Sequence, residues 1–312
     1  MLGTGGFAAP TFRALLDSRH QVLALVTQPV RERATGAMAP MREIARERGV
    51  PILDPPDVND AGARQALAEL SPDLFVVADY GQILSPETLA IPRQGSVNLH
   101  GSLLPKYRGA APINWAIYHG ETETGVTTIW MTPKVDAGPC LRQARTSIGP
   151  DETAADLEPR LAEIGAPAVL ETIEAIEAGD VRPLAQDAAL ASRAPRLKKQ
   201  HGAIDWSRPA QAIKNQVRAM EPWPRTFTHW LRAGHPAVRL IVERVEVDEM
   251  GNAGEAAPGT VLSAAGDTLL VAAGQGCISI WRLQPAGKRS LATEEFLRGY
   301  PVKAGDRFTA EP

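Results

Sequence analysis

The chain has 312 residues, which is enough for about two domains with a sizeable core. Its composition, 44% hydrophobic and 22% charged residues, is typical of a globular protein and excludes a disordered chain. No apolar run approaches the roughly 20 residues that span a membrane. The first ten residues have neither the basic nor the apolar region of a signal peptide, so we expect a cytoplasmic protein.

Cysteine and histidine usage argues against a metal centre. The chain has two cysteines, Cys140 and Cys277, which fits a reducing compartment, and they lie far apart in the chain. No group of Cys and His residues has the spacing of metal ligands. We therefore expect no metal site.

The charge is unevenly distributed along the chain. The formal net charge is -3, yet residues 196–312 contain 16 Lys and Arg against 12 Asp and Glu. The first 195 residues contain 17 basic against 24 acidic residues. A basic C-terminal part indicates an anionic partner for the second domain, with an ordinary solvated surface as the alternative.

The N-terminal half alternates apolar runs with helical patterns. Strands are predicted over 22–26, 74–78 and 126–131, and helices over 10–18, 41–48, 61–70 and 112–119. This alternation predicts an α/β fold with a Rossmann-like, mainly parallel sheet covered on both faces. Ligands of such sheets bind beyond the carboxyl ends of the strands.

A long helical stretch follows this half. Thr153 and Asp156 have the spacing of a capping box, and Gly179 ends the pattern. Pro159 and Pro167 each remove a helical hydrogen bond, so we expect a kink or break near Gly165. Residues 181–196 show no periodicity and have the composition of a linker.

The pattern changes again from residue 204. A helix over 209–220 precedes short strands over 238–247, 260–263, 268–272 and 278–283, separated by Gly and Asp turns. Short strands of this kind predict a small, OB-like β-barrel. We therefore predict an N-terminal domain over 1–187, a linker over 188–203 and a C-terminal β-barrel domain over 204–312.

Three side chains suggest a site for acyl chemistry. Asn98 and His100 are two residues apart at the end of a predicted strand, so both point to the same side of it. The Asn98 amide can donate to a developing oxyanion, and His100 can move protons near neutral pH. Asp136, which follows the next apolar strand, supplies a carboxylate to complete the set.

These residues belong to longer motifs that resemble a known family. The motifs Asn98–His100, Ser102–Pro105, Arg108–Ile113, Glu123–Thr127 and Asp136–Gly138 resemble the core of the folate-dependent formyltransferases. The C-terminal motifs Gly202–Trp206, Pro222–Pro224, Pro258–Leu262 and Leu283–Arg289 resemble the second domain of the members that act on an aminoacylated tRNA. The resemblance covers nearly the whole chain.

The resemblance implies a reaction and roles for the three residues. In this part of the family, 10-formyltetrahydrofolate donates its formyl group to the α-amine of methionine on initiator tRNA. By the same resemblance, Asn98 would bond the formyl oxygen, His100 would shuttle protons and Asp136 would orient and polarise His100, with residues 1–187 forming the folate-binding catalytic domain. We expect a monomer whose partners are this tRNA and the folate.

The resemblance also implies binding residues. A first folate-contacting segment is Ser102, Leu103, Leu104 and Pro105, and a second segment takes the pterin through its backbone: Tyr80, Gly81, Gln82, Ile83 and Leu84. Contacts to tRNA are expected from Arg31 and Arg33 in a loop and from Lys288 and Arg289 near the C-terminal end. The glycine-rich start at Gly3 lacks a downstream acid and does not indicate a dinucleotide.

Three features depart from the family. Asp79 replaces a small apolar residue, Pro139 stands where an acid is common, and only Met1 and Leu2 remain of the first strand, so the native start would lie upstream or a central strand is short.

Other functions remain as alternatives. A formyltransferase for a sugar nucleotide or another small amine would not need the basic second domain. A noncatalytic RNA-binding protein would not need Asn98, His100 and Asp136. An oxidoreductase is suggested because the first half also resembles the hydrolase domain of formyltetrahydrofolate dehydrogenase, but the chain is too short to include the dehydrogenase.

Overall fold

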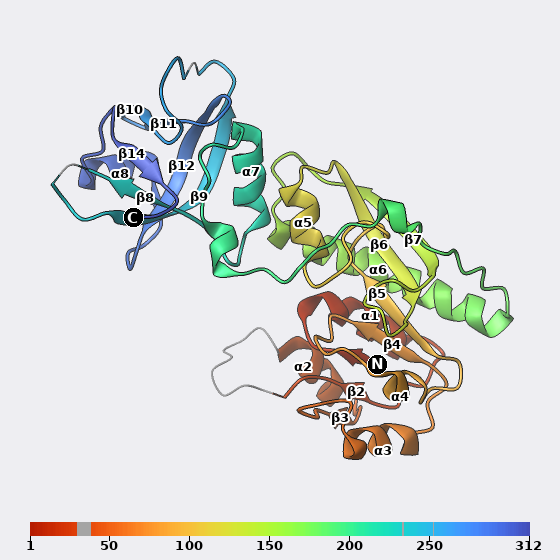
Figure 1. Cartoon of the computed structure of the whole chain (residues 1–312). Helices are drawn as coiled ribbons and strands as arrows, with labels where there is room; N and C mark the ends of the chain where they lie inside the picture. The colour runs from red at the N-terminus through yellow and green to blue at the C-terminus, as the bar shows by residue number, and fades with distance from the viewer. Residues whose placement is uncertain (30–38, 233, 252) are drawn as a thin grey trace. The chain divides into compact units, whose positions relative to one another are not determined.

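The computed structural model describes residues 1–29, 39–232, 234–251 and 253–312, so Arg31 and Arg33 lie outside the described residues. The chain divides into two compact units (Figure 1). Unit 1 consists of Met1–Ile113, Glu123–Ile148 and Asp156–Arg196, and unit 2 consists of Asn114–Thr122, Gly149–Ala155 and Leu197–Pro312. The main division at Leu197 falls inside the range predicted as a linker, and the predicted domain bounds themselves stay a prediction.

Unit 1 is built on a sheet whose order is β3-β2-β1-β4-β5-β6-β7. The strands from β1 to β5 pair in parallel, and β6 and β7 pair antiparallel at one edge, which confirms the predicted mainly parallel α/β sheet. Its central strands are apolar on both faces, as a sheet covered by helices requires. The strands are β1 (Leu2–Gly3), β2 (Leu25–Val26), β3 (Ile52–Leu53), β4 (Phe75–Ala78), β5 (Ser96–His100), β6 (Glu123–Trp130) and β7 (Cys140–Ser147).

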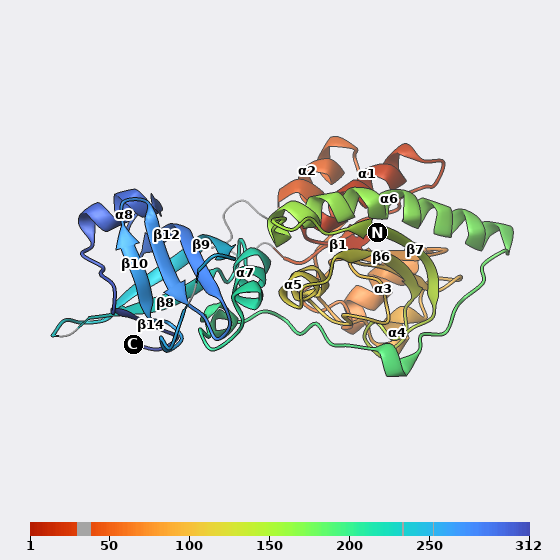
Figure 2. The same ribbon diagram turned by 90° about the horizontal axis from the view of Figure 1, so that it is seen from above.

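Helices cover both faces of this sheet. Helices α1, α2 and α6 lie on one face and α3 and α4 on the other (Figure 2). Asp60 and Ser85 cap α3 and α4 by accepting from the backbone N–H three residues on, which explains why these helices begin there. The helices of this half of the chain are α1 (Ala9–Asp17), α2 (Ala39–Glu47), α3 (Ala61–Glu69), α4 (Pro86–Leu89), α5 (Pro112–Tyr118) and α6 (Ala154–Ala178), with 3₁₀ helices η1 (Gly6–Ala8) and η2 (Ala188–Leu190).

Helix α6 runs through both of its prolines, so of the kink or break predicted near Gly165 the break was wrong, and the kink stays a prediction. Leu157, Leu161 and Val169 are fully buried, and this apolar packing offsets the cost of about 3 kcal/mol that an interior proline carries. Gly165 has a packing role instead, because a Cβ there would lie 2.6 Å from the Leu99 side chain of β5. The glycine lets the helix approach the sheet.

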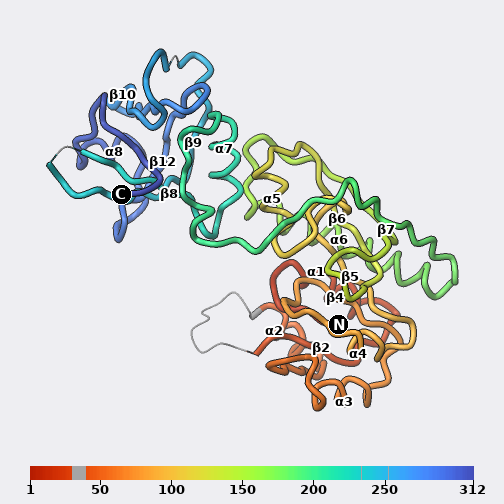
Figure 3. Tube along the Cα trace, viewed as in Figure 1, coloured from red at the N-terminus to blue at the C-terminus, as the bar shows by residue number. Residues whose placement is uncertain are grey.

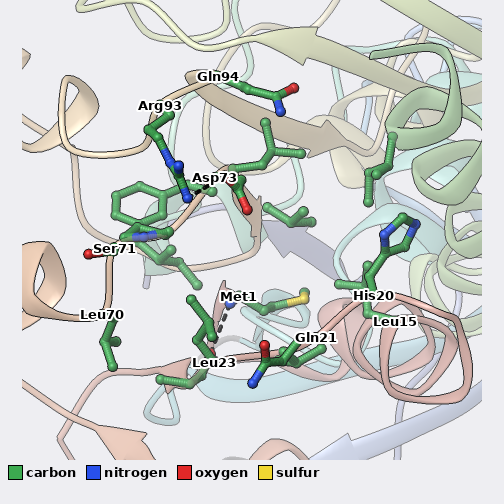
Figure 4. A pocket seen from close by; sticks show the side chains of 18 of the residues that line it. Met1, Leu15, His20, Gln21, Leu23, Leu70, Ser71, Asp73, Arg93 and Gln94 are labelled. Atoms are coloured by element: carbon green, nitrogen blue, oxygen red, sulfur yellow. Dashed lines mark hydrogen bonds and ion pairs between the residues drawn. The ribbon is translucent and has the colours of Figure 1, made fainter. Parts of the chain in front are cut away.

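A cavity of about 440 Å³ opens beside the start of β1 (Figure 4). The Met1 ammonium donates to the Ala24 carbonyl at 2.9 Å, and burial lowers the pKa of this amine to about 5. At another part of the lining, Arg93 forms an ion pair with Asp73 at 2.9 Å. The walls come from the segments that flank β1 in the sheet, 20–24 and 71–76.

Unit 2 contains an antiparallel sheet ordered β10-β11-β12-β9-β8-β14, with β13 paired to β12. Its two edges meet where Thr260 bridges Arg307, the Val261 N–H donates to the Asp306 carbonyl at 2.9 Å, and the Phe308 N–H donates to the Gly259 carbonyl at 2.7 Å. These bonds close the predicted small β-barrel. The elements are α7 (Ala210–Ala219), β8 (Thr226–Leu231), β9 (Val238–Asp248), β10 (Val261–Ala265), β11 (Thr268–Ala272), β12 (Cys277–Pro285), β13 (Leu291–Ala292), α8 (Thr293–Gly299) and β14 (Arg307–Thr309), with η3 (Lys199–Gly202) before them.

The barrel core is aromatic as well as aliphatic. Trp206, Trp230, Phe296 and Phe308 are buried together with the inward side chains of the strands. Each buried indole has a hydrogen-bond acceptor, because Trp230 Nε1 donates to Asp306 at 2.8 Å and Trp206 Nε1 donates to Thr228 at 3.0 Å.

Candidate active site

Asn98 and His100 lie on β5, between the parallel strand β4 and the antiparallel strand β6. Asn98 is in register with Val77 of β4 and Ile129 of β6, and His100 is opposite Thr127. Asp136 lies in the turn that joins β6 to β7. The three predicted catalytic residues are therefore brought together from segments up to 38 residues apart.

The Asp136 carboxylate lies next to both Asn98 and His100. Asn98 Nδ2 donates to Asp136 Oδ1 at 3.4 Å, and His100 Nδ1 lies 3.6 Å from Asp136 Oδ2. The Gly109 N–H donates to Oδ2 at 2.8 Å. Because His100 is buried and Asp136 is largely shielded from solvent, the attraction between a protonated imidazole and this carboxylate is only weakly screened.

The backbone fixes which nitrogen of His100 carries the proton. His100 Nε2 lies 2.9 Å from the Tyr107 carbonyl oxygen, which can only accept a hydrogen bond. Nε2 is therefore the protonated nitrogen of the neutral ring, and Nδ1 carries the free lone pair. Nδ1 faces the Asp136 carboxylate.

Asp136 is held in a strained backbone conformation. Its φ of +50° is in the left-handed region, which non-glycine residues adopt rarely and mostly at functional sites. The same turn requires Gly138, because a Cβ there would lie 1.7 Å from the Trp130 carbonyl oxygen. Pro139, a departure from the family pattern, accepts from the Trp130 N–H at 3.0 Å and so fits the turn.

Gln186 also fixes this turn, and sequence reasoning missed it. Its side-chain amide donates to the carbonyl groups of Asp136 and Gly138, at 2.8 and 2.7 Å. Its Oε1 accepts two bonds from the Arg108 guanidinium, at 2.9 and 2.7 Å. No pattern in the sequence marked Gln186, because the segment 181–196 has no periodicity.

That segment runs from α6 as an extended trace (Figure 3) and is attached to unit 1. Leu184 forms a bridge with Cys140, and Arg193 forms one with Arg108. Ser192 accepts from the Tyr107 N–H through its hydroxyl and from the Arg108 N–H through its carbonyl, both at 2.9 Å. The residues after α6 therefore buttress the loop that carries Tyr107 and Gly109.

A cavity of about 140 Å³ adjoins two of the predicted catalytic residues. Asn98 and Asp136 line it together with the whole predicted pterin loop, Tyr80, Gly81, Gln82, Ile83 and Leu84. Ile83 and Val135 are 69% and 51% exposed, so two apolar side chains border the opening. In the described part of the chain, the backbone N–H groups of Gln82 and Leu84 form no hydrogen bond, which leaves them available to a polar ligand.

The structure also explains why this loop contains Gly81. Its φ is +81°, and a Cβ would lie 2.3 Å from Gln28 Nε2. Gln28 donates to the Tyr80 carbonyl at 3.0 Å, and Gln82 Oε1 accepts from the Val58 N–H at 2.8 Å. These two contacts fix the loop on both sides. Separately, burial raises the pKa of Tyr80 to about 12.

The other predicted folate segment lies elsewhere. Ser102, Leu103, Leu104 and Pro105 are not among the residues that line the cavity. Leu104 packs with Ile129 and Cys140, its N–H donates to Thr127 at 3.1 Å, and the buried Ser102 hydroxyl donates to the Lys106 carbonyl at 2.7 Å. These contacts fix the loop that follows β5 against β6 and β7. A direct folate contact from this segment stays a prediction.

The remaining predicted residues that the structure describes belong to unit 2. Lys288 and Arg289 are exposed in the turn after β12, and Arg289 forms an ion pair with Glu295 at 2.5 Å. Among the described residues, no three His, Cys, Asp or Glu side chains are grouped so that they could hold a metal. None of the helices formed by those residues is long and apolar enough to span a bilayer.

Asp79, the other departure from the family, follows β4 next to the catalytic strand. Its φ is +44°, and its carboxylate occupies the space that a side chain at residue 5 would need. Loss of hydration in the surrounding protein, with the charge of Glu158 as a second cause, raises the pKa of Asp79 to about 6. The residue is nonetheless exposed on one side, so solvent limits this shift.

Comparison with known proteins agrees with this geometry. Residues 1–173 match the formyl transferase family model, and residues 196–301 match that of the formyl transferase C-terminal domain. The methionyl-tRNA formyltransferase of Citrifermentans bemidjiense is 42% identical over 97% of this chain and 94% of its own length. That of Moorella thermoacetica is 41% identical over 98% of this chain and 97% of its own length.

Solved structures show the same fold. A sugar 3N-formyl transferase crystallised with dTDP and 5-N-formyl-THF superposes with a TM-score of 0.67 at 18% identity, over 92% of this chain and 97% of its own. An N-formyltransferase from Helicobacter canadensis, in complex with folinic acid and dTDP-3-aminofucose, gives 0.65 at 17% identity, over 91% and 97%. Together with the full-length relatives, these matches establish that the chain belongs to the formyl transferase family, among the methionyl-tRNA formyltransferases.

Proposed function

We propose that this chain transfers the formyl group of 10-formyltetrahydrofolate to the α-amine of methionine on initiator tRNA. The observation that carries the proposal is the convergence of Asn98, His100 and Asp136 beside the cavity of the 80–84 loop. The arrangement occurs in a chain whose full-length relatives are named for this reaction.

The reaction starts when the amine attacks the formyl carbon. A carbon–nitrogen bond forms, and the carbonyl oxygen becomes an oxyanion. Asn98 has two amide hydrogens, of which one is directed to Asp136, and the other is available to the oxyanion. A preorganised donor of this kind is worth roughly 3 kcal/mol in the transition state.

The proton is then moved by His100. Its free Nδ1 accepts the proton that the attacking amine loses, and the resulting imidazolium is stabilised by Asp136. As the bond between the formyl carbon and the folate nitrogen breaks, the same proton passes to that nitrogen. The products are the formylated amine and tetrahydrofolate, and His100 returns to its neutral form.

The flat pterin ring of the formyl donor is proposed to bind in this cavity. The free N–H groups of Gln82 and Leu84 match the acceptor atoms at a pterin edge, and Ile83 and Val135 provide apolar contacts. The loop is already fixed by Gln28 and Val58, so it loses little conformational freedom on binding.

The partner of the second unit is proposed to be the tRNA. Residues 196–312 have four more basic than acidic residues, whereas the rest of the chain is acidic. We also propose that the protein is cytoplasmic. We propose that it is a monomer, because one chain supplies Asn98, His100 and Asp136. Light scattering of the purified protein tests its mass.

The test is a transfer assay with the purified chain and 10-formyltetrahydrofolate. Formyl transfer is measured to methionyl initiator tRNA, to uncharged tRNA and to an amino sugar nucleotide, with Asn98→Ala as the inactive control. We expect formylmethionine only from the first substrate. Efficient formylation of the sugar nucleotide with none of the tRNA would refute the proposal and favour the small-amine alternative.

A further inference from the structure

An irregularity in the barrel exposes two neighbouring side chains on β12. In the ladder between β9 and β12, Ile280 is opposite Val245 and Arg282 is opposite Arg244, so Trp281 has no partner in register. Trp281 and Arg282 are both exposed although successive residues of a regular strand point to opposite faces. Irregularities of this kind commonly direct a side chain toward a binding site.

The matching irregularity on β9 exposes an arginine beside this tryptophan. Glu243 is skipped in the ladder and Arg244 is exposed. The Arg244 guanidinium carbon lies 5.8 Å from the centre of the Trp281 ring, within the range of a cation–π contact. Trp281 itself is 54% exposed, so much of its ring remains accessible to solvent.

Arg244 and Arg282 differ from the neighbouring charged residues in their ion pairing. Glu243 pairs with Arg225, and Lys214 pairs with Asp151 and Glu246. Within the described part of the chain, by contrast, neither Arg244 nor Arg282 forms an ion pair. The one side-chain bond of Arg282 is to the Ser290 hydroxyl, at 3.4 Å.

Arg244 and Arg282 also line a single groove of unit 2. Its walls come from α7, from β9 and from the segment around Asp151. The walls also carry acidic side chains, of which Asp151, Glu246 and Glu243 are in ion pairs with Lys214 or Arg225, and Glu221 is the remaining one. The Arg244 and Arg282 guanidinium groups therefore meet in a groove whose acidic charges are mostly paired. Phosphate groups are the ligands that such charges favour. A flat, exposed indole next to them is a surface on which a base can stack.

We propose that Trp281, Arg244 and Arg282 form a nucleotide platform that binds the tRNA substrate. An unstacked base lies on the Trp281 ring, and the two guanidinium groups bind the adjoining phosphates. This inference rests on the proposed function, because it assigns the tRNA to a particular face of the barrel. A nucleic acid fits this surface better than a protein partner, since the exposed neighbours of Trp281 on these strands are Arg244 and Arg282.

The platform differs from the basic pair predicted from sequence. Arg289 is already neutralised by Glu295, which lowers the attraction that it offers to a phosphate. Arg244 and Arg282 have no such partner in the described chain. We therefore expect a larger loss of tRNA affinity from either of them than from Arg289.

The experiment measures binding of methionyl initiator tRNA to the full chain by filter binding at several salt concentrations. Trp281→Ala and Trp281→Leu are expected to weaken binding roughly 5- to 100-fold at every salt concentration, because stacking is uncharged. Trp281→Phe should restore most of the affinity. Arg244→Gln and Arg282→Gln should each flatten the plot of log affinity against log salt by about one unit.

Arg298→Gln is the matched control, because Arg298 is an exposed arginine of the same unit that pairs with Glu294. It should change neither affinity nor slope, and urea unfolding of each variant reports its fold. Equal affinities of wild type and Trp281→Leu would overturn the platform alone. Binding without formyl transfer by wild type would overturn only the proposed function, and no tRNA binding by wild type would overturn both.

Discussion

Gln186 holds the backbone of Asp136 in place from a segment 50 residues away in the sequence. Its amide bonds the carbonyl groups of Asp136 and Gly138, while its oxygen accepts from Arg108. The strained φ of Asp136 therefore has an external support. Because the Asp136 carboxylate faces His100, a movement of this turn changes the distance across which the imidazolium is stabilised.

We predict that Gln186→Glu lowers kcat roughly 10- to 100-fold, since small misplacements of catalytic groups cost that much. The new carboxylate keeps the acceptor for Arg108 but repels the two carbonyl groups that the amide bonded. The KM for the folate donor should change little. Steady-state kinetics measure both constants, and Gln211→Glu, at an exposed position of α7, is the control substitution. An unchanged kcat would show that the turn keeps its conformation without the Gln186 hydrogen bonds.

His100 and Asp136 are expected to act as one proton-transfer unit. His100→Ala and Asp136→Ala should each lower kcat/KM by about a hundredfold or more with the fold retained. The double variant should be little worse than the more damaging single variant, because either change alone removes the stabilised imidazolium. Transfer kinetics on the three variants, together with their circular dichroism, make the comparison. Losses that multiply would indicate independent roles.

The sequence predicted the parallel sheet because its central strands are apolar on both faces, as in Phe75–Ala78. It also predicted that Asn98 and His100 lie on the same side of one strand, since alternate residues of a strand point to the same side. Edge strand β7 was missed. Its charged residues, such as Arg142 and Arg145, face solvent and break the apolar pattern.

Gln186 and the path of α6 could not be predicted for a different reason. The Gln186 bonds join residues 48 to 78 positions apart, and no local pattern encodes them. Pro159 and Pro167 are local signals that favour a break, but burial of Leu157 and Leu161 under the sheet outweighs them. In both cases tertiary packing decides.

Gly5 and Asp79 are expected to depend on each other. A Cβ at residue 5 would lie 1.7 Å from Asp79 Oδ2, so Gly5→Ala forces the carboxylate to move. Only the end of the exposed Asp79 side chain has to move, so we expect a loss of about 0.5–1 kcal/mol in the free energy of unfolding.

In the background of Asp79→Ala, Gly5→Ala should cost much less. Gly6→Ala is the control, since a Cβ at Gly6 meets nothing within 4 Å. Urea unfolding of the cycle measures the coupling, and equal costs in both backgrounds would contradict it.

The raised pKa of Asp79 makes stability depend on pH. The pKa is about 6 in the folded chain, against 3.8 for an ordinary Asp side chain, so the folded state retains a proton that the unfolded state has lost. Stability should therefore fall as pH rises from about 4 to 6 and stay lower above that range. Asp79→Asn removes this titration. It should match wild type near pH 4 and exceed it in stability at pH 7.5, while Asp267→Asn, on an exposed turn of unit 2, should track wild type at both values. Urea midpoints at the two pH values decide the matter, and a constant difference between wild type and Asp79→Asn would show that the carboxylate does not titrate in this range.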